Sequence, residues 1–173
     1  MMAHVNIEIK ARCGDADKVR GILRAQGAEF KGRDRQTDIY FSVPRGRLKL
    51  RCGDIENALI YYDRPDGPGP KRSDVHLCPC PPESGMEALL TELLGVRVRV
   101  VKEREIYFLG NIKFHIDTVE GLDNFVEIEA IDADGSIGRE RLLEQCRRFM
   151  TLLEIDGADL IDRSYSDMLM EDA

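Results

Sequence analysis

The sequence predicts an α+β protein with roughly seven or eight mostly antiparallel strands and three or four helices. Three observations lead to this prediction. Segments in which apolar and charged residues alternate recur along the chain, as they do in half-buried strands. Most of these segments are joined by short turns such as Gly110–Asn111, which favours antiparallel pairing. A sheet of this size could close into a barrel, because closure removes its exposed edges.

Length and composition favour one globular domain over residues 1–173. Charged residues make up 33% of the chain, and the net charge of -7 argues against nucleic acid as a nonspecific partner. A local basic site remains compatible with that charge. No apolar run is long enough to span a bilayer, and the N-terminus lacks the hydrophobic stretch of a signal peptide. We therefore expect a cytoplasmic protein, a monomer or a homodimer, without a membrane partner.

The five cysteines are odd in number and scattered, which favours reduced thiols over a disulfide framework. Cys78 and Cys80 lie in the segment CPCPP, whose spacing is not that of a zinc site. A proline-rich loop is the better interpretation of this segment.

The first half of the chain predicts four strands and two helices in turn. Strands are expected at 6–10, 35–43, 47–52 and 58–65 because apolar and polar residues alternate there. A helix is expected between the first two strands, capped by Asp15 or Asp17 and ended near Gly27. A flexible loop follows at 66–74. The next helix, at 83–95, has a capping box from Ser84 to Glu87 and an expected apolar face of Met86, Leu89, Leu90 and Leu93.

The second half is denser in strands. One long strand is expected at 96–109, its partner at 112–120 and a further strand at 125–131, separated by the turns GN and GLDN. The segment 136–154 predicts an amphipathic helix. Its inward face is expected to comprise Leu142, Cys146, Phe149, Met150 and Leu153. A final helical turn is expected within 162–169.

Several strands place two or three charges on one face and aliphatic residues on the other. The charged faces comprise Glu8 and Lys10; Arg47, Lys49 and Arg51; Tyr62 and Arg64; Lys102 and Arg104; His115 and Asp117; and Glu127 and Glu129. If the sheet curls with these faces inward, its interior is a charged tunnel. The alternative is an ordinary solvated face, which we expect for Arg97, Arg99, Glu103 and Glu105. His115 is expected to have no chemical role, and Tyr40, Tyr61, Tyr62 and Phe108 are expected to serve packing.

The charges are segregated by strand, with cations gathered on some strands and carboxylates on others. Glu127 and Glu129 point to one face, about 7 Å apart along the strand. Like charges in a low-dielectric site repel, and oxygen ligands suit Mg²⁺ or Mn²⁺. Lys and Arg side chains beside such a metal suit phosphate oxygens. The pattern therefore predicts a linear, highly anionic, metal-bound ligand.

At its N-terminus the chain resembles the CYTH family of triphosphate tunnel metalloenzymes, whose signature is ExExK. Asn6, Glu8 and Lys10 match that signature, with an amide in place of its first acid. The resemblance continues in order through RLKLR (Lys49, Arg51), YYDRPD (Arg64), KRSD (Arg72, Asp74), VVKERE (Lys102, Arg104), HIDTVEGL (Asp117) and FVEIEA (Glu127, Glu129). The resemblance covers nearly the whole chain, and the sequence is similar to the branch labelled CyaB-like.

This resemblance implies an eight-stranded antiparallel closed β-barrel, or tunnel, with flanking helices, and dependence on Mg²⁺ or Mn²⁺. The expected catalytic residues are Glu8, Lys10, Glu127 and Glu129. The expected phosphate ligands are Lys10, Lys49, Arg51, Arg64, Arg72, Lys102 and Arg104, and the expected metal ligands are Glu8, Asp117, Glu127 and Glu129. The expected substrate is a small triphosphate such as tripolyphosphate, thiamine triphosphate or ATP.

Three activities remain open from the sequence. Hydrolysis of the triphosphate is favoured because it needs only water and a held phosphate chain. A class IV adenylyl cyclase, which makes cyclic AMP and pyrophosphate from ATP, is the alternative. A polyphosphate- or nucleotide-binding module with little turnover is the third, since Asn6 removes one negative charge from the site.

Overall fold

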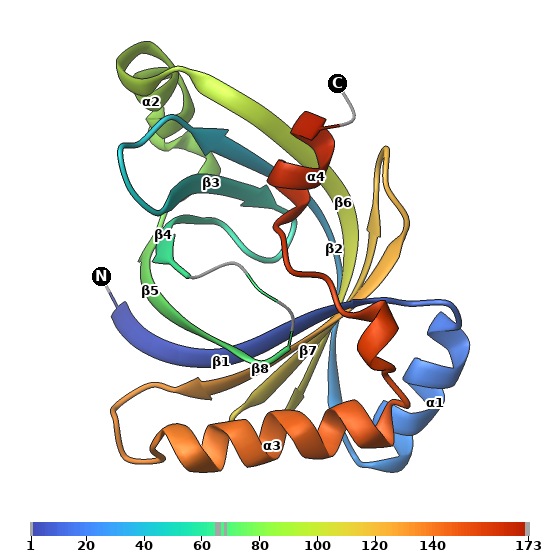
Figure 1. Cartoon of the computed structure of the whole chain (residues 1–173). Helices are drawn as coiled ribbons and strands as arrows, with labels where there is room; N and C mark the ends of the chain where they lie inside the picture. The colour runs from blue at the N-terminus through green and yellow to red at the C-terminus, as the bar shows by residue number, and fades with distance from the viewer. Residues whose placement is uncertain (1, 65–66, 68, 172–173) are drawn as a thin grey trace.

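The computed structural model describes residues 2–64, 67 and 69–171, and in this part of the chain the α+β prediction is confirmed. Eight antiparallel strands form a closed barrel in the order β1-β5-β4-β3-β2-β6-β7-β8 (Figure 1). Their bounds are β1 Met2–Arg12, β2 Glu29–Phe41, β3 Arg47–Gly53, β4 Ala58–Asp63, β5 Lys71–Pro79, β6 Val96–Leu109, β7 Ile112–Val119 and β8 Asn124–Asp132. The predicted strand end at residue 65 and loop residues 66 and 68 lie outside the described residues.

Two helices cover the apolar outer face of the barrel. They are α1, Ala16–Ala25, and α3, Arg139–Leu152, which lies against β1 and β8 (Figure 1). Asp15 caps α1, since its side chain accepts a hydrogen bond of 2.9 Å from the Lys18 amide. The outward-facing Ile7, Ile9 and Ile128 share a buried cluster with the inward face of α3. The aliphatic side of the strands is thus packed outside the barrel, which leaves the charged side for the interior.

The helix α2, Met86–Leu94, departs from the sequence prediction. Its N-cap is Gly85, which makes no side-chain cap, so the expected capping box from Ser84 to Glu87 is wrong. Leu90 is buried, but Leu89 is 53% and Leu93 67% exposed. The expected apolar face is therefore only half covered, by Met86 and Leu90, because α2 contacts the barrel mainly through β2, at the end away from α1 and α3 (Figure 1).

The segment after α3 crosses one end of the barrel. It contains a short 3₁₀ turn, Gly157–Asp159, and the helix α4, Tyr165–Glu171. A second 3₁₀ turn, Pro82–Ser84, lies elsewhere and precedes α2. Ile161 donates its amide to the Lys10 carbonyl at 2.8 Å, and the Lys71 ammonium donates to the Asp162 carbonyl at 2.9 Å.

Further along the same segment, the Tyr165 hydroxyl donates to Asp117 at 2.8 Å and Asp167 pairs with Arg47 at 2.8 Å. These partners lie on β1, β5, β7 and β3, so the segment spans the barrel from side to side and closes that end. Among the described residues no helix combines the length and apolar character needed to cross a membrane.

Candidate active site in the barrel interior

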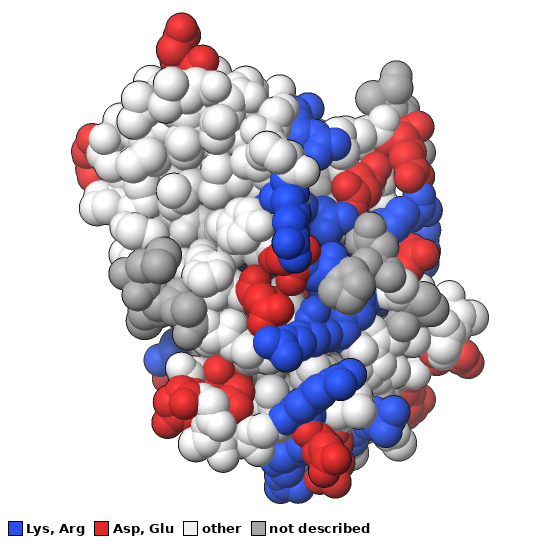
Figure 2. All heavy atoms as spheres, turned by 60° about the vertical axis from the view of Figure 1, so that its left-hand side comes forward, with Lys and Arg blue, Asp and Glu red and all other residues white. Residues whose placement is uncertain are grey.

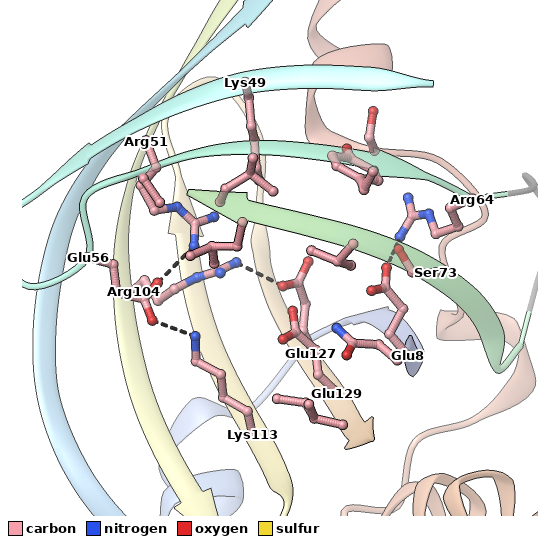
Figure 3. Close-up of a pocket in the computed structure, with 18 of the residues that line it drawn as sticks. Glu8, Lys49, Arg51, Glu56, Arg64, Ser73, Arg104, Lys113, Glu127 and Glu129 are labelled. Atoms are coloured by element: carbon pink, nitrogen blue, oxygen red, sulfur yellow. Dashed lines mark hydrogen bonds and ion pairs between the residues drawn. The ribbon is translucent and has the colours of Figure 1, made fainter. Parts of the chain in front are cut away.

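The barrel encloses a cavity of about 450 Å³ whose wall is built from alternate residues of the strands. Nine of the predicted site residues line it: Glu8, Lys10, Lys49, Arg51, Arg64, Lys102, Arg104, Glu127 and Glu129. Figure 3 shows Arg51 and Arg104 on one side of Glu127 and Glu129, and Arg64 with Glu8 on the other. The inward curl of the charged strand faces therefore brings together residues that lie far apart in the sequence.

One face of the molecule carries a different balance of charge from the whole chain. Figure 2 shows Lys and Arg side chains gathered in a band, with Asp and Glu side chains between them and a largely uncharged area beside them. An acidic protein with a net charge of -7 therefore presents a local basic region. Such a region attracts anionic ligands over short distances even when the total charge is negative.

Three cations of the cavity converge on one buried carboxylate, Asp38 of β2. Its oxygens accept hydrogen bonds from Lys49 at 2.9 Å, from Lys102 at 2.8 Å and from two nitrogens of Arg51 at 2.8 and 3.0 Å. Burial alone would raise the pKa of Asp38, but the three cations outweigh it and hold that pKa well below its usual value. Burial, together with the neighbouring Arg104, lowers the pKa of Lys102 to about 7.

Arg104 is held from two sides. Its guanidinium donates to Asp117 at 2.7 Å and to Glu127 at 2.8 Å, and Tyr165 supports Asp117 from the closing segment. Asp117 is fully buried and is not among the residues that line the cavity. The structure therefore places Asp117 behind Arg104, where it orients a cation, and does not bring it to the other expected metal ligands.

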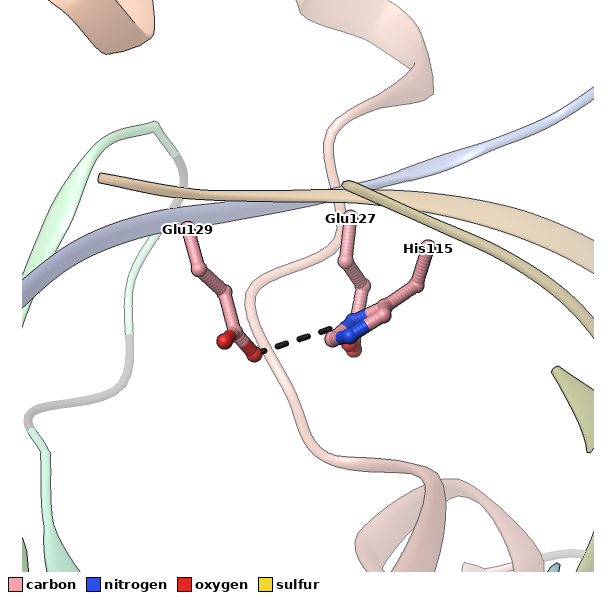
Figure 4. A group of neighbouring side chains, drawn as sticks. All are labelled: His115, Glu127 and Glu129. Carbon is pink, nitrogen blue, oxygen red and sulfur yellow. Dashed lines mark hydrogen bonds and ion pairs between the residues drawn. The ribbon is translucent and has the colours of Figure 1, made fainter. Parts of the chain in front are cut away.

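The acidic centre is formed by Glu127 and Glu129 of β8 with His115 of β7 (Figure 4). The Nδ1 atom of His115 lies 3.1 Å from Glu127 and 3.7 Å from Glu129, and one ligand atom from each residue falls within 4.8 Å of the others. Burial lowers the pKa of His115 to about 3, so the imidazole is neutral, as a metal ligand must be.

Glu129 lacks the cationic partners that Glu127 has. Glu127 contacts Arg104 at 2.8 Å and Lys10 at 3.2 Å, and the Lys10 ammonium also lies 3.4 Å from the centre of the Tyr165 ring. Burial, to which the charges of Glu8 and Glu127 add, raises the pKa of Glu129 to about 7. A bound cation would relieve this repulsion.

The amide of Asn6 adds a further oxygen to this region. Asn6 lines the cavity, two residues from Glu8 on β1, and its Oδ1 is buried without a hydrogen-bond partner. Glu8, which pairs with Arg64, is directly opposite Glu129 in the β1–β8 ladder. This set of oxygens with one neutral imidazole fits a divalent cation such as Mg²⁺ or Mn²⁺.

Arg72 is the second predicted site residue that does not reach the cavity. It lies on the outer face of β5, where its side chain is 54% exposed and pairs with Asp74. Lys71 and Ser73 face inward instead, and both are buried. Residues 66–74 were predicted to form a flexible loop, but β5 begins at Lys71, and the alternation of side chains along this strand directs Arg72 outward.

Sequence reasoning missed several residues of the interior. Period-two alternation within 35–43 would have placed Asp38 on the same face as Tyr40, and Lys113 shares its face with His115 and Asp117. His115 was expected to have no chemical role, yet it contacts both glutamates of the acidic centre. Other missed residues are Glu56, which comes from a loop, and Tyr165, which comes from the closing segment.

Glu105 corrects a prediction about the outside of the barrel. It was expected to be solvated, but it is only 5% exposed. Arg20 of α1 donates to it at 2.8–3.1 Å and the Tyr107 hydroxyl at 2.9 Å, so the helix covers this charge and neutralises it.

Comparison with known proteins agrees with this geometry. The model of the CYTH domain matches residues 4–165. The chain belongs to the CYTH family. The Methanocaldococcus jannaschii protein named "Putative adenylate cyclase MJ0240" is 28% identical over 174 residues, covering 95% of this chain and 98% of that protein. Adenylate cyclase CyaB of Aeromonas hydrophila is 27% identical over 168 residues, 92% of this chain and 85% of that one.

The same fold occurs in the solved structure of the putative adenylyl cyclase HpAC1 from Hippeastrum, which is described as having a dominant triphosphatase activity. That structure has a TM-score of 0.61 and 14% sequence identity, and the match covers 96% of this chain and 94% of that chain. At this level of identity the likeness concerns the fold.

Proposed function

We propose that this CYTH protein is a divalent-metal-dependent triphosphatase that cleaves the terminal phosphate from a small triphosphate. The observation that carries the proposal is the pairing of a cationic wall with an acidic centre inside one cavity of the barrel. A linear polyphosphate with bound metal has the complementary arrangement, because its oxygens suit Lys and Arg while its metal suits carboxylates. The Hippeastrum relative with triphosphatase activity supports the same direction.

The phosphate chain would be held by Lys10, Lys49, Arg51, Arg64, Lys102 and Arg104. In the structure these cations are engaged by carboxylates, for instance Lys49 and Lys102 by Asp38. Phosphate oxygens can share or replace these acceptors, and Arg forks match them in a bidentate way. The cations would also neutralise charge that develops on the phosphoryl oxygens in the transition state.

Glu8, Glu127 and Glu129, with His115, would hold Mg²⁺ or Mn²⁺. The bound metal supplies Lewis acidity and lowers the pKa of water at the terminal phosphorus. His115 would orient Glu127 through its 3.1 Å contact, and Asp117 would orient Arg104. The segment carrying Ser164 and Tyr165 closes one end of the cavity and limits access of bulk water.

Two other activities are each supported by one observation. The names of both sequence relatives favour a cyclase, in which the ribose 3′-hydroxyl of ATP would attack the α-phosphorus and expel pyrophosphate. Asn6 favours a binding module with little turnover, since its amide carries no charge for the metal.

Product analysis separates these activities. The purified protein is incubated with Mg²⁺ or Mn²⁺ and, separately, with tripolyphosphate, thiamine triphosphate and ATP, and the products are resolved by chromatography. We expect phosphate release that Glu127→Ala abolishes and that Glu120→Ala, a change at an exposed acid, leaves intact. Cyclic AMP with pyrophosphate would establish the cyclase, and bound ligand without product would establish the binding module.

A further inference from the structure

One carboxylate stands at the end of the cavity that the segment of Ser164 and Tyr165 does not cover, which we call the open end, and it belongs to none of the metal-binding or phosphate-binding groups. Glu56 lies in the loop 54–57 between β3 and β4 and lines the cavity. It accepts a hydrogen bond of 2.8 Å from Arg51 and pairs with Lys113 of β7. Since β4 and β7 are diametrically opposite in the strand order, this pair crosses the width of the barrel interior. Figure 3 shows Glu56 between Arg51 and Lys113, on the far side of the glutamates from Arg64.

The loop that carries Glu56 is fixed in place. The amides of Ile55 and Glu56 each donate to the buried carboxylate of Asp34 at 2.9 Å. The Asn57 side chain exchanges two hydrogen bonds with the backbone of Gly53, at 3.1 and 2.7 Å. A Cβ at Gly53 would meet the Asp34 carboxylate at 2.6 Å, so the turn and its anchor are in close contact. Glu56 is therefore part of the wall of the cavity.

Glu56 also remains charged. Burial would raise its pKa, but Arg51 and Lys113 hold that pKa far below its usual value. The residues around it at this end are mostly uncharged: Ile55, Leu77, Phe108 and Ile131 line the cavity there. In the part of the chain that the structure describes, the Lys113 ammonium at this end is already paired with Glu56, so a further phosphate gains little there, whereas an uncharged organic group finds apolar surface.

The other end of the cavity is closed by the segment containing Ser164 and Tyr165. A ligand whose phosphates reach Arg64 and Lys10 must therefore point its remaining end toward Glu56. We propose that Glu56 is a specificity residue that ends the row of phosphate-binding cations at the open end, so that the site accepts an uncharged group beyond the third phosphate and rejects a fourth phosphate. This inference rests on the proposed function for the number of phosphates held.

Two ligands that extend tripolyphosphate in different ways test this inference. ATP adds a nucleoside, and linear tetrapolyphosphate adds a fourth phosphate. Dissociation constants for tripolyphosphate, ATP and tetrapolyphosphate are measured by calorimetry without divalent metal, so that no ligand is cleaved. We expect the wild type to bind ATP at least about tenfold more tightly than tetrapolyphosphate, a difference of about 1.4 kcal/mol.

The Glu56→Gln variant keeps the size of the side chain and removes its charge. The measured quantity is the dissociation constant for tetrapolyphosphate divided by that for tripolyphosphate. We expect this ratio to be at least about tenfold lower in Glu56→Gln than in the wild type. Asp54→Asn removes an exposed charge from the same loop and should leave the relative affinities for the three ligands unchanged. An equal gain for all three ligands in Glu56→Gln would overturn the inference, because Glu56 would then only compete for Arg51 and Lys113.

These measurements separate the failure of the inference from the failure of the proposed function. Binding with the expected ratios but without hydrolysis in Mg²⁺ or Mn²⁺ refutes the triphosphatase and leaves the role of Glu56 standing. Hydrolysis of tripolyphosphate with equal affinity for ATP and tetrapolyphosphate refutes the role of Glu56 alone. No binding of any of the three ligands by the wild type, together with no phosphate release in Mg²⁺ or Mn²⁺, refutes both.

Discussion

The carboxylate of Asp38 is the common partner of three buried cations, and its replacement by Asn tests how the interior is balanced. The amide nitrogen of Asn cannot accept a hydrogen bond, and the residue carries no charge to offset Lys49, Arg51 and Lys102. Asp38 and Lys102 are each 1% exposed, so solvent cannot take the place of the lost partner. Removing one member of a buried ion pair costs about 3–5 kcal/mol.

For a chain of this length, 1 kcal/mol corresponds to about 2–4 °C in the melting temperature, so Asp38→Asn should lower it by about 6–20 °C. Thermal and urea unfolding measure this loss. Tripolyphosphate supplies anionic oxygens to the same cations, and a ligand at one hundred times its dissociation constant adds about 2.7 kcal/mol of stability. The stabilisation by tripolyphosphate should therefore be larger in the variant than in the wild type.

The matched control is Asp123→Asn, which removes a carboxylate that is 72% exposed and pairs with Arg12. Exposed pairs of this kind contribute at most about 1 kcal/mol. If Asp38→Asn destabilised the protein no more than Asp123→Asn, or if tripolyphosphate stabilised variant and wild type equally, the reasoning about the buried cations would be refuted.

Three further predictions concern the ligands of the cavity. Asn6→Glu should tighten the binding of the activating metal, so that a lower Mg²⁺ or Mn²⁺ concentration gives half-maximal activity. An unchanged metal dependence would show that residue 6 does not face the metal. Because the pKa of Lys102 is lowered to about 7, this group is mostly neutral at pH 8 in the free protein, and a bound polyanion favours its charged form. Calorimetry in two buffers should therefore detect proton uptake on tripolyphosphate binding at pH 8 that decreases toward pH 6, and Lys102→Arg should take up fewer protons than the wild type at pH 8. Arg64→Gln should weaken tripolyphosphate binding at least about tenfold, whereas Arg72→Gln, on the outer face, should leave it within about twofold; equal losses would refute the assignment of faces.

Alternation along single strands predicted most of the cavity, because it depends only on the backbone geometry of the strand itself. Lys49, Arg51, Lys102, Arg104, Glu127 and Glu129 all face inward as the pattern indicates. Arg72 does not, since it was assigned through the family resemblance and lay in the predicted loop 66–74, to which no alternation was applied, whereas the structure begins β5 at Lys71.

Other parts of the site depend on contacts between distant segments, which local patterns do not contain. Glu105 is buried only because α1 brings Arg20 over it from another part of the chain. Glu56 enters the cavity from a loop, where no period applies. The role of Asp117 as a support for Arg104 follows from the register of β6 and β7, in which the two residues are direct partners.

The way β1 is paired has a consequence for how the protein is made. β1 is synthesised before both of its neighbours, β5 and β8, and β8 begins only at Asn124. Residues of the closing segment, Ser164 and Tyr165, come later still. Contacts between such distant segments form slowly because long loops must close first. A growing chain therefore carries β1 with its β8 edge unpaired until residues 124–132 have been made, and the wall of the cavity is complete only after residues 164 and 165 have followed.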